Sequence, residues 1–178
     1  MSIPSPIVLI LGAGPNIGQS VARAFAAKGY RTALTSRKAT EANNSANEIY
    51  IEADFTDPSS VVNAFSKVKS ELGMPPSVVV YNAAGANLNP PDDPLALALS
   101  NFERSLTINA TSAFVAAQQA TLGFAKLPDT ASRTFIYTGN ILNTNFVIPP
   151  LMDLGVGKSA MSHVVQASAG AYGGKGFK

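Results

Sequence analysis

Near its start the chain has a short apolar run that passes directly into a glycine turn. Residues Ile7 to Leu11 read IVLIL, and the next seven residues are GAGPNIG. A continuous β-branched and aliphatic run is typical of a strand that is buried on both faces. The segment Gln19 to Ala27 then carries apolar residues at helical spacing, and Gly29 is predicted to end that helix. Strand, glycine turn and helix in this order predict the first half of a parallel β-α-β unit.

The same alternation continues along the chain. Four further strands are predicted, over Thr32–Thr35, Ile49–Ala53, Ser77–Tyr81 and Arg133–Thr138. Three further helices are predicted, one capped by Asp57-Pro58 and stopped by Gly73, one over about Phe102–Phe124 and one over Gly155–Ala169. Such alternation predicts an α/β fold, a Rossmann-like doubly wound parallel sheet with helices on both faces and five readable strands. Because its proline clusters mark only loops, the chain (1–178) is expected to form a single domain.

Composition excludes several classes of protein. Of 178 residues, 46% are hydrophobic and 13% charged, with a net charge of +2, which describes a globular protein with no bias toward nucleic acid or a membrane surface. No cysteine is present, so no disulfide or thiolate site is expected. No apolar run approaches the roughly 18 residues that span a bilayer, and no His/Asp/Glu group has metal-ligand spacing. We expect a cytoplasmic protein with a small-molecule substrate and no metal.

The glycine turn is the first candidate site. Gly12, Gly14 and Gly18 form a GxGxxxG pattern that also contains Asn16 and Ile17. Glycines here permit a tight turn and let a pyrophosphate approach backbone amides at a helix N-terminus. The pattern favours dinucleotide binding, and a purely structural turn is the alternative.

Arg37 follows the second predicted strand, 19 residues after Gly18 (37 − 18), in the sequence TSRK. Folds that prefer NAD usually place an acid here for the ribose 2′-hydroxyl, whereas an arginine accommodates the 2′-phosphate of NADP. No acid is available, so NADP(H) is predicted over NAD(H). Two solvated basic residues at a strand end are the alternative.

Together with the glycine turn, three further segments resemble the short-chain dehydrogenase/reductase family, and the resemblance extends from about Ile7 to Ala169. The segment EADFTD matches the one after the family's third strand, which implies that Asp54 meets the adenine amino group and that Phe55 supplies a backbone contact. YNAAG resembles the family's Asn-Asn-Ala-Gly motif. Asn82 matches, Ala83 replaces the second asparagine, and Gly85 closes the motif.

Two further features of the resemblance concern asparagines. Asn109, within LTINATSAF, matches the family asparagine that supports a proton relay. Asn16 stands where the family usually has glycine, and asparagine is the residue that best tolerates a positive φ in its place.

The family's catalytic pair is a Tyr-x-x-x-Lys on the helix after the fifth strand. Lys158 matches the lysine, which implies that it binds the nicotinamide ribose, but Leu154 stands at the tyrosine position. Asn140 most nearly replaces the family serine, and Thr138 is a less well aligned hydroxyl. Since leucine transfers no proton, reduction of a carbonyl is expected to be impaired. Another donor, such as water, a substrate group or Tyr137, stays open.

Four other polar or charged candidates and one histidine are predicted to have no catalytic role. Tyr172 and Lys175 are only three residues apart and lie far from the fifth strand, so they do not restore the motif. His163 is predicted to be a packed or surface side chain, and Glu103 and Arg104 are predicted to be solvated.

Three hypotheses of function follow. The first is an NADP(H)-dependent oxidoreductase that acts on a carbonyl or alcohol with weakened catalysis. The second is a non-catalytic nucleotide-binding regulator or partner protein, and the third is a non-redox enzyme in a redox-derived pocket. The resemblance also implies two further strands and a substrate-covering loop, which this chain is expected to lack. The small residues of NATSAFVAAQQATLGFA permit close helix packing. The resemblance implies a homodimer through that helix and the one after it, and packing against the chain's own sheet is the alternative.

Overall fold

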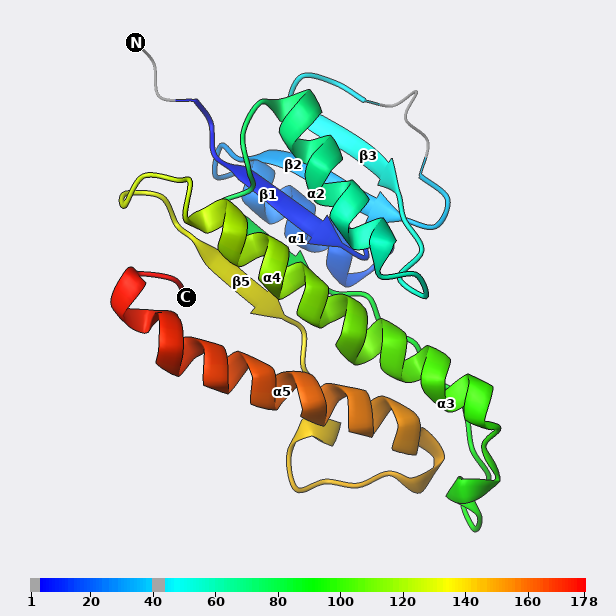
Figure 1. Cartoon of the computed structure of the whole chain (residues 1–178). Coiled ribbons are helices and arrows are strands. Elements are labelled where there is room, and N and C mark those ends of the chain that lie inside the picture. Colours follow the sequence, from blue (N-terminus) through cyan, green and yellow to red (C-terminus); the bar gives the residue numbers. More distant parts are fainter. Residues whose placement is uncertain (1–3, 40–43) are drawn as a thin grey trace.

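The computed structural model describes residues 4–39 and 44–178. Within them, five strands form one sheet in which all neighbours are parallel, in the order β3-β2-β1-β4-β5 (Figure 1). The strands are β1 (Ile7–Leu11), β2 (Arg31–Ser36), β3 (Glu48–Glu52), β4 (Val78–Tyr81) and β5 (Thr134–Tyr137). All five predicted strands are confirmed to within two residues. The continuous apolar runs of β1 and β4 are buried along their whole length, as expected for central strands of a parallel sheet.

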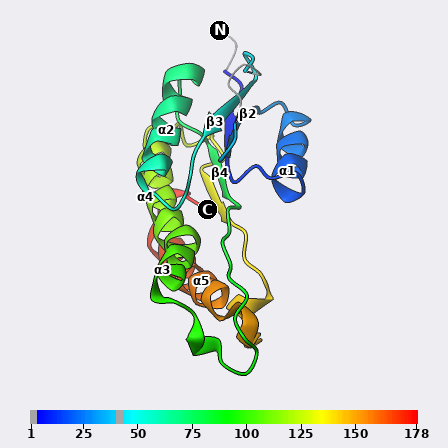
Figure 2. The same ribbon diagram turned by 90° about the vertical axis from the view of Figure 1, so that its right-hand side faces the viewer.

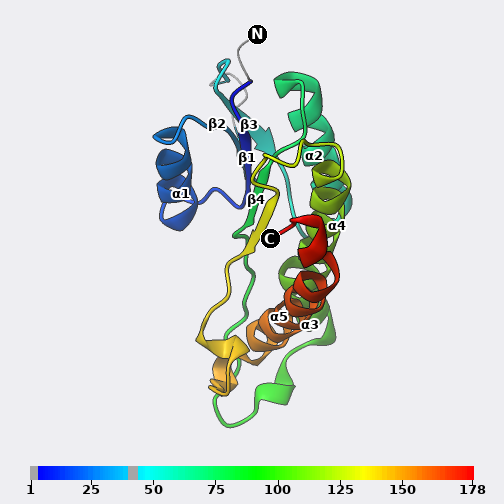
Figure 3. The same cartoon turned by 90° about the vertical axis from the view of Figure 1, so that its left-hand side faces the viewer.

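The described residues also form five α-helices, four of which lie between strands, and α5 follows the last strand. They are α1 (Ile17–Ala26), α2 (Ser59–Leu72), α3 (Leu99–Leu106), α4 (Ser112–Phe124) and α5 (Met152–Tyr172). In two views from opposite sides, each turned by 90° from Figure 1, α1 covers one face of the sheet and α2 and α4 cover the other, with α3 and α5 on the same side as α4 (Figures 2 and 3). This arrangement confirms the predicted doubly wound sheet.

Alternate residues of the central strands feed two apolar cores. On the α1 side, Val8 and Ile10 of β1 pack with Ala22 of α1. On the opposite side, Leu9 of β1 belongs to the larger core, which includes Val61 of α2. Every side chain of β1 is fully buried. Burial of apolar surface is the main stabilising term in folding, so the sheet is a rigid base for the loops at its carboxyl edge.

The start and end of α2 follow from its sequence. The helix begins at Ser59, one residue later than predicted, with Pro58 as its N-cap at φ −59. The Asp57 carboxylate accepts the Ser59 backbone N–H at 2.9 Å and the Ser59 hydroxyl at 2.6 Å, so it still satisfies a free donor of the first turn. Gly73 ends the helix at φ 78, a left-handed conformation that glycine adopts without steric penalty.

The single long helix predicted over 102–124 is interrupted. Between α3 and α4 the residues Thr107–Thr111 form a π-helical turn that contains Asn109. The Asn109 side chain donates to the Ser105 carbonyl at 2.9 Å. In a regular α-helix this carbonyl would instead accept the backbone N–H of residue 109. Single π turns of this kind are frequent at functional sites.

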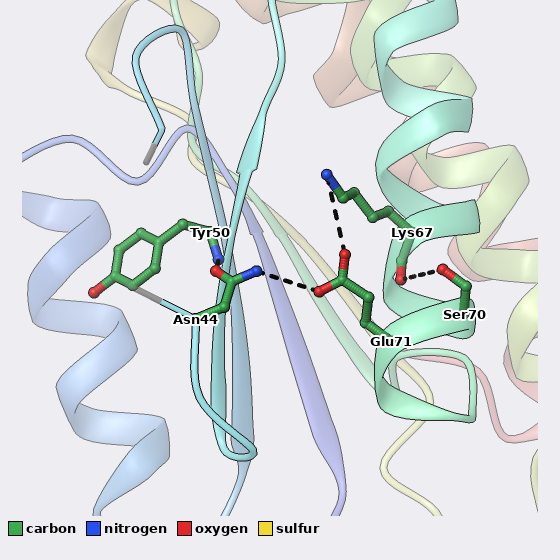
Figure 4. Close-up of polar contacts among 5 residues, drawn as sticks. All are labelled: Asn44, Tyr50, Lys67, Ser70 and Glu71. Atoms are coloured by element: carbon green, nitrogen blue, oxygen red, sulfur yellow. Dashed lines mark hydrogen bonds and ion pairs between the residues drawn. The ribbon is translucent and has the colours of Figure 1, made fainter. Parts of the chain in front are cut away.

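Two groups of contacts lie beside the edge strands of the sheet, β3 and β5. Beside β3, the Asn44 side chain accepts the Tyr50 backbone N–H at 2.7 Å and donates to Glu71 of α2, whose carboxylate also lies 4.0 Å from Lys67 Nζ (Figure 4). At the other edge, Lys178 donates to the Arg133 carbonyl and accepts the Phe135 N–H, so the glycine-rich tail lies along β5.

Candidate functional site

A cavity of about 520 Å³ opens at the carboxyl ends of β1, β2, β3 and β4. In open parallel sheets this edge is where ligands bind. Eight of the predicted cofactor residues line the cavity: Gly12, Gly14, Arg37, Asp54, Phe55, Asn82, Ala83 and Gly85. The other four, Asn16, Ile17, Gly18 and Lys158, lie outside its lining. The sheet therefore brings together residues from four separate stretches of the sequence.

Gly12 is held tightly against the loop after β4. Its φ is 99, and an added Cβ would lie 2.5 Å from the Ala83 backbone nitrogen. Its N–H donates to the Thr35 hydroxyl at 3.0 Å, and its carbonyl accepts from the Asn82 side chain at 2.9 Å. Both the backbone conformation and the close approach therefore require glycine here.

The rest of the glycine turn divides into a packed and an open part. An added Cβ on Gly18 would lie 2.5 Å from the Ala13 Cα, whereas an added Cβ on Gly14 would meet nothing within 4 Å. Gly14 thus leaves free space beside the turn, at the N-terminal end of α1, where a phosphate group would meet backbone amides. Asn16 has φ −88. Its tolerance of a positive φ is therefore not used here, because the turn places its left-handed residue at Gly12.

Asp54 follows β3 and projects from an exposed position. One carboxylate oxygen accepts the Thr56 backbone N–H at 3.0 Å. This bond, and then the positive charges of Arg37 and Arg104, hold the pKa of the Asp54 carboxyl below its usual range. Asp54 is therefore an ionised acceptor at the cavity wall at neutral pH.

Sequence reasoning missed Arg104 as a site residue. It is exposed, as predicted, but it lies in the wall of the cavity, with Ser105 and Ile108 of the same helical segment. It reaches the wall because α3 is bound to the loop after β4, where the Ser105 hydroxyl donates to the Gly85 carbonyl at 3.2 Å, and no local sequence pattern signals this position.

The loop after β4 is tied to α3 through Asn109, which is fully buried. Its side chain donates to the Gly85 carbonyl at 2.6 Å and accepts the Gly85 N–H at 3.3 Å. Gly157 of α5 packs against the same asparagine, since an added Cβ would lie 2.5 Å from the Asn109 Cβ. Asn109 therefore joins the cavity wall, α3 and α5.

Asp153 provides a second tie that the sequence did not suggest. It directly precedes Leu154 and is 1% exposed. One of its oxygens accepts the Asn87 backbone N–H at 3.0 Å and the Asn87 side chain at 2.8 Å. Because Asn87 lines the cavity, this carboxylate fixes the cavity wall to the first turn of α5.

Two of the residues predicted for catalysis, Lys158 and Asn109, both contact Tyr137 at the end of β5. Lys158 is buried, its Nζ donates to the Thr138 carbonyl at 2.7 Å and lies 4.5 Å from the centre of the Tyr137 ring. The Tyr137 hydroxyl donates to the Asn109 carbonyl at 2.8 Å, and burial raises its pKa. Tyr137 is thus a poor proton donor toward a substrate.

Leu154 and Asn140 complete this region. Leu154 is half-buried on α5, one turn before Lys158. Asn140 is exposed, and its side chain accepts the Leu142 N–H at 3.0 Å while Asn143 accepts the Asn140 N–H at 2.8 Å. Its amide caps a short helical turn in this structure.

Burial lowers the pKa of Lys158 to about 8. Because the folded pKa is depressed below the ordinary value near 10.4, the unfolded chain holds this proton through a pH range in which the folded chain releases it. We expect the stability of wild type relative to Lys158→Met to rise from pH 8 to about pH 10, measured by urea unfolding. The exposed Lys126, changed to Met, is the control. A difference that stays constant over this range for Lys158→Met would contradict the assignment.

Other candidates lie away from the cavity or are absent. His163 is exposed on α5 and does not line the cavity. In the described part of the chain, no three His, Asp or Glu side chains gather as metal ligands would. The same residues include no helix with the length and apolar character needed to cross a membrane.

Comparison with known proteins agrees with this geometry. Residues 6–131 match the family model described as short chain dehydrogenase. The chain is 49% identical, over 98% of its length and 74% of the relative's, to the short chain dehydrogenase/reductase dmxR12 of Cryptosporiopsis sp. (strain 8999).

Solved structures share the fold. A short-chain dehydrogenase/reductase from Serratia marcescens superposes with a TM-score of 0.78 at 24% identity, covering 94% of this chain and 72% of that one. A short-chain type dehydrogenase/reductase from Mycobacterium marinum gives a TM-score of 0.82 at 24% identity, covering 98% and 72%. The chain belongs to the short-chain dehydrogenase/reductase family of oxidoreductases, which bind an NAD(P) cofactor.

Proposed function

We propose that the chain is an NADP(H)-dependent oxidoreductase that acts on a carbonyl or alcohol, with catalysis weakened by Leu154 at the tyrosine position of the family. The observation that carries the choice of cofactor is the lining of the cavity. Arg37 is the charged residue that directly follows β2 in this lining, and the neighbouring residue is Ser36 rather than an acid. An arginine suits a 2′-phosphate, which a carboxylate would repel.

The described residues fit a dinucleotide. The open space beside Gly14 admits a pyrophosphate, and the ionised Asp54 offers an acceptor to the adenine amine. Asn109 keeps the loop at Gly85 in place as the other wall. When bound, the cofactor supplies or accepts a hydride. Lys158 is proposed to bind the nicotinamide ribose, and to do so its Nζ must exchange the bond to the Thr138 carbonyl for one to the ribose.

A second candidate function, a non-catalytic NADP(H)-binding protein, is favoured by a specific observation. Neither the residues at the family's tyrosine and serine positions nor Tyr137 offers a free proton donor. The Tyr137 hydroxyl bonds to the Asn109 carbonyl, Asn140 caps a turn, and Leu154 carries no proton. Under this reading the cavity binds cofactor and no hydride is transferred.

One experiment separates the oxidoreductase from the alternatives. The chain is incubated with NADPH deuterated at the transferable position of the nicotinamide and with a panel of carbonyl compounds, and products are examined by mass spectrometry. Deuterium in an alcohol product supports the oxidoreductase. Binding of NADPH without label transfer supports the non-catalytic protein, and a changed product without label supports a non-redox enzyme.

We also propose a homodimer that forms through α4. Ala113, Ala116 and Ala120 pack in the chain's own core, so the interface rests instead on Phe114 and Leu122, which are 45% and 59% exposed on α4. We expect a dimeric mass by light scattering at micromolar concentration and a monomeric mass for Phe114→Glu/Leu122→Glu, because two charges would be buried without partners. A monomeric wild type at that concentration would refute the dimer.

The cytoplasmic location, the single domain over 1–178, the small-molecule substrate and the lack of a nucleic-acid partner stay predictions from the sequence.

A further inference from the structure

The arginines of the chain fall into two groups. All five lie in the described residues, and three have protein partners: Arg23 donates to the Ser20 hydroxyl, Arg31 to the Leu72 carbonyl and Arg133 to the Asp129 carboxylate. The guanidinium groups of Arg37 and Arg104 form no hydrogen bond or ion pair with a described residue, and both line the cavity. An unengaged guanidinium in a cavity wall has its five donors and its planar face available to a ligand.

Arg104 reaches the cavity from a different wall than Arg37. Arg37 follows β2, whereas Arg104 belongs to α3 and lies with Ser105 and Ile108 near the loop at Gly85. Both positive charges nevertheless lower the pKa of Asp54. Arg104 therefore lines the same cavity as Asp54, the residue at which the proposed function places the adenine amine.

We propose that Arg104 binds the adenine ring, and so supplies affinity that NADP(H) and NAD(H) share, while Arg37 acts only on the 2′-phosphate. This rests on the proposed function, in which the cavity holds a dinucleotide. A guanidinium stacks on planar aromatic rings, and the attraction strengthens where water is excluded. The apolar side chain of Ile108 lines the same wall of the cavity as Arg104.

The test uses three fragments of the cofactor and calorimetric or NMR-detected binding, so that no turnover is needed. The fragments are adenosine 2′,5′-bisphosphate, 5′-AMP and reduced nicotinamide mononucleotide. We expect Arg104→Gln to weaken the first two by the same factor, about 3- to 10-fold, and to leave the third unchanged. Arg37→Gln should weaken only the bisphosphate. Arg23→Gln removes the same charge far from the cavity and is the matched control, expected to change none.

A lysine at the same position separates stacking from charge. Arg104→Lys keeps the charge beside Asp54 but removes the planar group, so we expect it to recover only part of the affinity for 5′-AMP. Unchanged binding of 5′-AMP by Arg104→Gln would overturn the proposal. Weakening of the bisphosphate alone would also overturn it, since Arg104 would then be a phosphate ligand. A wild type that binds none of the fragments, NADPH or NADH would overturn the proposed function as well, whereas normal wild-type binding with an unaffected Arg104→Gln overturns only the role of Arg104.

Discussion

The double variant Leu154→Tyr/Asn140→Ser is expected to reduce carbonyls with NADPH at least about 10-fold faster than wild type. Residues 154 and 158 are one turn apart on α5, so a phenol at 154 would lie beside the buried Lys158 ammonium. General acids are worth about 10² to 10⁴ in rate. Serine at 140 can keep the cap on the Leu142 N–H, because serine is itself a favoured capping residue. The rate is measured as NADPH oxidation with matched product analysis.

Leu154→Phe/Asn140→Ser is the matched control for this variant. It adds the aromatic ring without the hydroxyl, so a gain that appears with tyrosine and not with phenylalanine assigns the effect to the proton donor. An unchanged rate with intact NADPH binding would mean that the missing donor does not limit turnover. A fast wild type that the tyrosine abolishes would mean that another group donates the proton and that Leu154 belongs to the substrate wall.

Gly12→Ala is expected to lower the free energy of unfolding by roughly 2–5 kcal/mol. The added methyl would lie 2.5 Å from the Ala83 nitrogen and 2.8 Å from its Cα, and backbone atoms of a buried sheet edge do not move aside as a flexible side chain does. The φ of 99 adds strain for any residue with a Cβ. Urea unfolding followed by circular dichroism measures the loss.

Gly14→Ala is the control for this prediction, because its Cβ meets nothing within 4 Å. Its free energy of unfolding should stay within about 0.5 kcal/mol of wild type. Its NADPH affinity should nevertheless fall, since the methyl takes the space into which the pyrophosphate fits. Equal stability losses in the two variants would show that the turn is not built as described.

The sheet was predictable because each of its strands is locally encoded. The run IVLIL has no polar side that could face water, so it predicts a strand that is buried on both faces. The glycine turn that follows it marks the end of β1 and the start of α1. The π turn at Thr107–Thr111 was not predictable, because helical periodicity continues through it in the sequence. Its cause is tertiary, in that Asn109 turns its side chain to both Ser105 and the Gly85 loop.

The candidate site was predictable only where a motif lies within one segment. Gly12, Arg37 and Asp54 each follow a strand, and the parallel sheet brings strand ends to one edge. Arg104 and Asp153 carry no such signal, since each reaches the cavity wall through helix packing or a bond to Asn87. The resemblance of Lys158 to the family lysine likewise does not indicate that its Nζ donates to the Thr138 carbonyl.

Selection of NADP(H) by Arg37 is tested by equilibrium binding of the two cofactors. Dissociation constants for NADPH and NADH are measured by the quenching of tyrosine fluorescence or by calorimetry, for wild type and for Arg37→Glu. We expect wild type to bind NADPH about 10-fold or more tightly than NADH, since an arginine–phosphate pair is a charge-assisted bond. Arg37→Glu should reverse the order, because a carboxylate repels the 2′-phosphate and accepts the 2′-hydroxyl. Equal dissociation constants for the two cofactors in wild type would contradict the claim.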